Sequence, residues 1–109
     1  MQLEVRSRGM EVTTALTDYC SNRIATHLGR FASEVETVTI RIDDLNGPRG
    51  GIDKRVQIHV VLRRAPAINV EVAKTEVWTA IDNVTLRVGA CVARNLKRRS
   101  QLYLRERAL

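Results

Sequence analysis

The order of two hydrophobic patterns along the chain is what most constrains its fold. Segments that alternate apolar and polar residues indicate strands with one buried face, and apolar residues at helical spacing indicate amphipathic helices. Alternation occurs over residues 2–8, 37–43, 55–63 and 68–73, and helical spacing over 14–31 and from about residue 75 onward. We expect Thr13 or Thr14 to cap the first helix, and Thr75 to cap the second with Glu76 in its first turn.

This order predicts an α+β fold with the element sequence β-α-β-β-β-α. The first strand, helix and strand should form a parallel pair with a right-handed crossover, and the later strands should be antiparallel. Each strand has one apolar face, so both helices should cover that face of a four-stranded mixed sheet. The apolar stripe of the last helix ends near Leu96. We therefore expect a domain over 1–96 and a basic extension of the last helix over 97–109.

The positive charge of the chain is concentrated at its C-terminal end. The net charge is +6, yet residues 1–86 carry equal numbers of basic and acidic side chains. The excess comes from residues 87–109, where Glu106 is the single acid among seven cations. A polyanionic partner and a solvated, frayed tail both fit this distribution. No apolar run is long enough to cross a membrane, and no export signal is visible, so we expect a cytoplasmic protein without a membrane partner.

The cations of the two helices follow helical spacing. At about 100° per residue, four arginines of the last helix fall within about 20° of one line beside the apolar stripe. Arg23 and Arg30 flank the apolar face of the first helix in the same way. Two neighbouring helices could gather these side chains around a shared groove, where guanidinium groups would bind phosphate. Solvated helix faces, paired with Asp18 or Asp82, are the alternative. The four arginines are Arg87, Arg94, Arg98 and Arg105.

Catalysis and metal binding find little support in the sequence. His27 lies on a core-facing side of a helix and His59 on the polar side of a strand, and neither has a zinc-like spacing with a cysteine. Asp43, Asp44 and Asp53 border a loop, where turn geometry explains acids as well as chemistry does. We expect no catalytic residue, no metal, no cofactor and no small-molecule substrate.

The glycine-rich stretch GPRGGIDKR at 47–55 is not a phosphate-binding loop of a known kind. It joins two strands, whereas the P-loop joins a strand to a helix and needs Ser or Thr after its lysine. Its GxxG match to KH domains lacks the required helical context. The predicted open sheet face carries no aromatic residue, which argues against an RNA-recognition motif of the RRM type.

Several local strings, in this order, resemble the ribosome hibernation promoting factors, also called ribosome-associated inhibitor or sigma-factor modulation proteins. The strings are GMEVTTAL at 9–16, LGRF at 28–31, GGIDKR at 50–55, and AID at 80–82 with the preceding Trp78. The resemblance implies a domain similar in shape to double-stranded RNA-binding domains. It also implies a non-enzymatic protein that binds the small ribosomal subunit and its rRNA in the decoding channel, and that silences or protects ribosomes in stress or stationary phase.

The resemblance also implies which residues bind rRNA. The matching positions are Arg23, Arg30, Arg87, Arg94, Lys97 and Arg98. Apart from the resemblance, we take four further cations as secondary candidates: Lys54, Arg55, Arg99 and Arg105. The chain departs from its relatives at Thr14, where proline is common, and at Gly89 and Ala90, which are expected to thin the basic face of the helix. It ends at Leu109 without the second domain of long-form relatives, so we expect that it does not pair ribosomes alone. A monomer is the default expectation for the free protein.

Two alternatives stay open from the sequence. A general double-stranded RNA-binding or ribosome-assembly protein would use the same basic helices. An enzyme acting on a phosphorylated substrate at the 43–55 loop would use Arg49, Lys54 or Arg55.

Overall fold

The computed structural model describes residues 1–45 and 53–108, and their order of elements confirms the predicted α+β fold. A short 3-10 turn, η1, takes the place of the last residues assigned to the first helix. The elements are β1 (Gln2–Arg8), α1 (Thr14–Leu28), η1 (Gly29–Phe31), β2 (Val35–Asp44), β3 (Lys54–Leu62), β4 (Ile68–Lys74) and α2 (Val77–Ala108).

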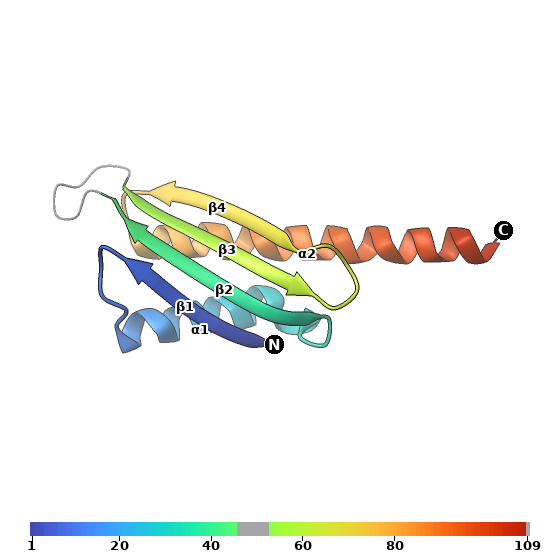
Figure 1. Cartoon of the computed structure of the whole chain (residues 1–109), viewed down its shortest axis with the longest axis horizontal. Helices are drawn as coiled ribbons and strands as arrows, with labels where there is room; N and C mark the ends of the chain where they lie inside the picture. The colour runs from blue at the N-terminus through green and yellow to red at the C-terminus, as the bar shows by residue number, and fades with distance from the viewer. Residues whose placement is uncertain (46–52, 109) are drawn as a thin grey trace.

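The four strands form one sheet in the order β1-β2-β3-β4, with both helices on one face (Figure 1). The β1–β2 pair is parallel, and β2–β3 and β3–β4 are antiparallel, as predicted. Ile40 of β2 is opposite Ile58 of β3, which in turn is opposite Val70 of β4. This register places the apolar side chains of neighbouring strands together under the helices.

The core lies between the sheet and the helices. Cys20 and Ile24 of α1 and Ile81 and Val88 of α2 are fully or almost fully buried against the inward side chains of β2 and β3. α2 packs mainly against β3 and β4 and lies beside α1. The first half of α2 is thereby fixed to the sheet, and its second half continues beyond the sheet (Figure 1).

The two predicted helix caps have different outcomes. The Thr13 side chain accepts a hydrogen bond from the backbone N–H of Leu16 at 3.1 Å, so Thr13 caps α1. The prediction that Thr75 caps α2 is wrong, because β4 continues to Lys74 and α2 begins only at Val77. Glu76 consequently precedes the first turn of α2, and its backbone carbonyl accepts the N–H of Ala80 at 3.1 Å.

Candidate nucleic-acid interface

A straight row of arginines runs along α2. The row consists of Arg87, Arg94, Arg98 and Arg105, and all four side chains are exposed. At about 1.5 Å per residue it is about 27 Å long. Apart from Glu106, whose side chain lies outside the described ones, no described carboxylate lies within ion-pair distance of any of the four. Arg94 contacts the sulfur of Cys91 at 3.2 Å. An exposed, unneutralised row of guanidinium groups favours a polyanion as its partner.

The row lies on the flank of α2 that points away from α1. Asp82 and Gly89, which contact α1, are about 140° and about 160° around the helix from Arg87. The prediction that the arginines of the two helices surround a shared groove is therefore wrong. Lys97 and Arg99 are also exposed, on other sides of α2, so the projecting half of the helix carries cations around much of its circumference.

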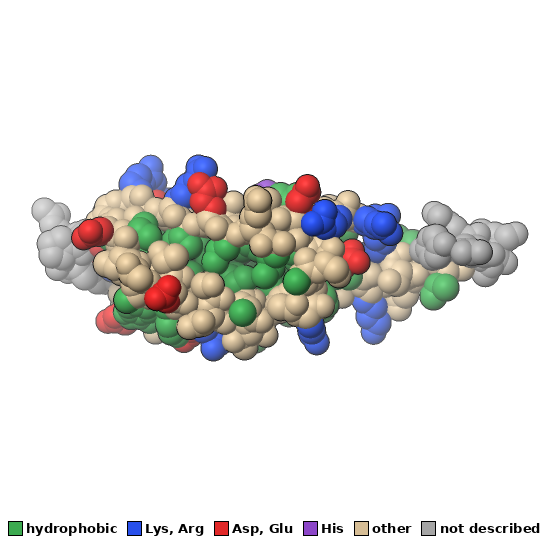
Figure 2. Space-filling view, turned by 90° about the horizontal axis from the view of Figure 1, so that it is seen from below, with side chains coloured by type: hydrophobic (Ala, Val, Ile, Leu, Met, Phe, Trp, Pro, Cys, Tyr) green, Lys and Arg blue, Asp and Glu red, His purple; other side chains and the backbone are tan. Residues whose placement is uncertain are grey.

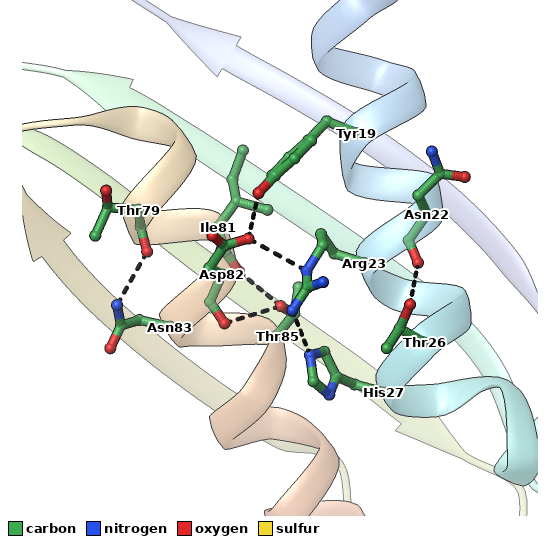
Figure 3. Close-up of polar contacts among 10 residues, drawn as sticks. All are labelled: Tyr19, Asn22, Arg23, Thr26, His27, Thr79, Ile81, Asp82, Asn83 and Thr85. Atoms are coloured by element: carbon green, nitrogen blue, oxygen red, sulfur yellow. Dashed lines mark hydrogen bonds and ion pairs between the residues drawn. The ribbon is translucent and has the colours of Figure 1, made fainter.

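Arg23 holds the two helices together and is partly neutralised. Its Nε lies 3.2 Å from the carboxylate of Asp82, and its Nη2 lies 2.9 Å from the ring of His27 (Figure 3). The Tyr19 hydroxyl donates to the same carboxylate, and this hydrogen bond raises the pKa of Tyr19. Burial, and then the neighbouring Arg23, lower the pKa of His27, which keeps its ring neutral near pH 7. The pairing with Asp82, foreseen as an alternative, makes Arg23 a weaker candidate for phosphate than the α2 row.

Arg30 lies at the other end of α1, in η1. Its guanidinium carbon is 4.6 Å from the centre of the Phe31 ring, which is a cation–π contact. No described carboxylate forms an ion pair with it, and its side chain is exposed. Arg30 thus keeps its charge available, in contrast to Arg23.

Gly89 allows α1 and α2 to approach closely. It is buried, and a Cβ atom at this position would lie 2.9 Å from the backbone oxygen of His27. The expectation that Gly89 thins the basic face is therefore wrong, because the residue faces α1 and not the arginine row. Its place in the helix interior is explained by packing, despite the low helix propensity of glycine.

Lys54 and Arg55 form ion pairs with acidic side chains of β2, β4 and the residue before β3. Lys54 Nζ lies 2.9 Å from Asp53 and 3.1 Å from Asp44, and these hydrogen bonds raise its pKa. Arg55 pairs with Asp43 at 2.9 Å and Glu71 at 3.3 Å. Asp43 and Asp53 are buried, so their role in this network is structural. Most of the GPRGGIDKR stretch, including Arg49, lies outside the described residues.

A comparison with protein-family models gives one match over residues 3–100, to the family described as Sigma 54 modulation protein / S30EA ribosomal protein. The chain belongs to this family. The resemblance inferred from the sequence strings is thereby confirmed. The Sigma 54 modulation / S30EA family consists of ribosome-associated, non-enzymatic modulators, so ribosome association and regulation of translation are the general function of this chain.

Solved structures show the same fold as this member of the S30EA family. The N-terminal domain of Protein Y from Thermus thermophilus is similar with a TM-score of 0.71 at 23% identity, over 86% of this chain and 98% of that one. A ribosomal subunit interface protein from Coxiella burnetii is similar with a TM-score of 0.70 at 14% identity, over 86% of this chain and 96% of that one. No curated protein matches the chain by sequence.

A second group of arginines lies on the described sheet, where Arg6, Arg8, Arg41 and Arg55 line a hollow together with Asp43 and Glu71. Ion pairs with carboxylates hold three of these arginines, so this group is partly neutralised, in contrast to the α2 row. The open sheet face carries Thr39, Arg41, Gln57, His59 and Asn69, which line a shallow hollow without a Phe, Tyr or Trp side chain. None of the described helices has both the length and the apolar character needed to cross a membrane. The described part of the chain also holds no cluster of three metal-ligating side chains.

Proposed function

We propose that this chain binds the rRNA of the small ribosomal subunit near the decoding channel, and that it silences or protects ribosomes in stress or stationary phase. Family membership supports a ribosomal partner. The observation that carries the proposal is the exposed row formed by Arg87, Arg94, Arg98 and Arg105, which has no described carboxylate partner. The protein would act in the cytoplasm as a monomer, by occupying space and without chemistry.

The proposed contacts differ in their expected strength. Arginines bind phosphate through bidentate, charge-assisted hydrogen bonds, which read the shape of the RNA backbone and not its base sequence. The α2 row, Lys97 and Arg30 are free to form such bonds, whereas Arg23, Lys54 and Arg55 first have to leave carboxylates of this chain. We therefore rank the α2 row first, and Arg99 beside it.

Salt dependence tests this proposal with the unmodified protein. If four arginines contact phosphates, raising the salt concentration from 50 to 200 mM should lower the affinity for purified small subunits about a hundredfold. The reason is that each contact releases counterions from the RNA, and salt opposes this release. Co-sedimentation at both salt concentrations measures the change. Binding that does not vary with salt would contradict a phosphate-based interface. Equally tight binding to a free RNA duplex would favour a general double-stranded RNA-binding or ribosome-assembly protein.

A further inference from the structure

A surface hollow lies where α2 leaves the sheet. Its volume is about 530 Å³, and it is formed by three separate parts of the chain: the residue before β2, the β3–β4 turn and the second half of α2. Leu96 still packs against the core, and α2 then continues beyond the sheet (Figure 1). The lining residues are Glu34, Arg64, Leu96, Arg99, Ser100 and Leu104.

Two cations, Arg64 and Arg99, line the hollow together with one acid, Glu34, which forms no ion pair with either of them. Arg64 and Arg99 are both exposed, and neither forms an ion pair with a carboxylate of the described residues. Figure 2 shows several Lys and Arg side chains near the start of the projecting half of the molecule, with an acidic side chain among them. Two guanidinium groups that share a hollow repel each other unless an anion lies between them.

The β3–β4 turn is held in place, so the position of Arg64 is defined. The backbone N–H of Arg63 donates to the carbonyl of Glu34 at 2.9 Å, and Arg63 Nε donates to the carbonyl of Ser33 at 3.1 Å. These two bonds fasten the turn to the segment between η1 and β2. Arg64 therefore faces α2 from a fixed backbone, which reduces the entropy lost when an anion binds.

We propose that this hollow binds a backbone phosphate of RNA, with Arg64 and Arg99 as its charged ligands and the Ser100 hydroxyl as a further donor. The inference rests on the proposed function and adds Arg64, which lies outside the two helices. Glu34 lines the same hollow and opposes an anion, so its charge should limit the affinity. Leu96 and Leu104 supply an apolar wall of a kind that suits the ribose next to the phosphate.

Three single substitutions test the hollow on purified small subunits. Arg64→Ala should weaken binding about tenfold and reduce the slope of log affinity against log salt by about one. Glu34→Gln should strengthen binding several-fold, because it removes the opposing charge. Arg41→Ala is the matched control, since Arg41 is an exposed cation on the open sheet face and its loss changes the net charge equally.

The outcomes separate this inference from the proposed function. If Arg64→Ala and Arg41→Ala have the same affinity for subunits while the wild type binds them, the proposal that the hollow binds phosphate is overturned. The proposed function of the chain then still stands. If the wild type does not bind subunits, the proposed function fails. The hollow is then tested alone, by following the side-chain N–H signals of Arg64 and Arg99 in NMR titrations with a short RNA duplex and with inorganic phosphate. Shifts with RNA at concentrations where inorganic phosphate gives none support the inference. No shift, or equal shifts with both, overturns it.

Discussion

Reversing the charge of Arg87, Arg94 and Arg98 to Glu should lower the affinity for small ribosomal subunits at least about a thousandfold. Each substitution removes a charge-assisted hydrogen bond worth about 1.5–3 kcal/mol and adds repulsion from the phosphate. The three side chains are exposed and lack described carboxylate partners, so the fold should not change. Co-sedimentation with purified subunits measures the loss, and circular dichroism with a thermal melt verifies the fold.

A matched control distinguishes the effect of the α2 face from the effect of net charge. Arg6, Arg41 and Lys74 are exposed cations of the sheet, and their reversal to Glu changes the net charge by the same amount. This control variant should lose much less affinity, since its effect is limited to long-range electrostatics that salt screens. Equal losses in the two variants would mean that only net charge matters. Unchanged binding of the α2 variant would show that the assigned face is wrong.

Gly9→Ala should lower the free energy of unfolding by about 2–5 kcal/mol. Gly9 has a φ of +80°, where a Cβ atom is unfavourable by about 1–2 kcal/mol. A Cβ atom here would also lie 2.5 Å from the backbone oxygen of Asp44, so the end of β2 would have to move. Overpacking of this kind typically costs a further 1–3 kcal/mol. The expected fall in melting temperature is about 10–20 °C.

Gly29→Ala is the control for this prediction. Gly29 has a φ of −55°, in the helical region, and a Cβ atom there would meet nothing within 4 Å beyond its own stretch of backbone. Alanine at such a site generally stabilises a protein by about 0.4–1 kcal/mol, because it restricts the unfolded chain. Thermal or urea unfolding of both variants should thus give effects of opposite sign. If Gly9→Ala is as stable as the wild type, residue 9 does not lie as close to the end of β2 as the structure shows.

The strands and their order were predictable because burial on one face imposes a period of two. Val38, Ile40 and Ile42 show this period directly, and each is fully buried. The start of α2 was less predictable, since Thr75 and Glu76 look like a helix start by their chemistry. The pairing of β4 with β3 continues to Lys74, and this tertiary contact moves the helix start to Val77. Local capping preferences do not include such contacts.

The arginine row was predictable from spacing alone, but its orientation relative to α1 was not. A helical pattern shows which residues share a line, and it does not show on which flank a second helix lies. Gly89 carried that signal, because a glycine inside a helix often marks a close approach of another backbone. The convergence of Arg64 with Arg99 was beyond sequence reasoning, because it depends on how far α2 extends past the β3–β4 turn.

The most direct test of the central claim is site-specific photo-cross-linking on the ribosome. Ala90 is exposed on α2 between Arg87 and Arg94, and Asn69 is exposed on the open face of the sheet. A benzoylphenylalanine placed at Ala90 should cross-link to small-subunit rRNA near the decoding channel, and one placed at Asn69 should do so with much lower yield. Equal yields from both positions, or cross-links from Ala90 to no small-subunit rRNA, would contradict the claim that the α2 face binds this RNA.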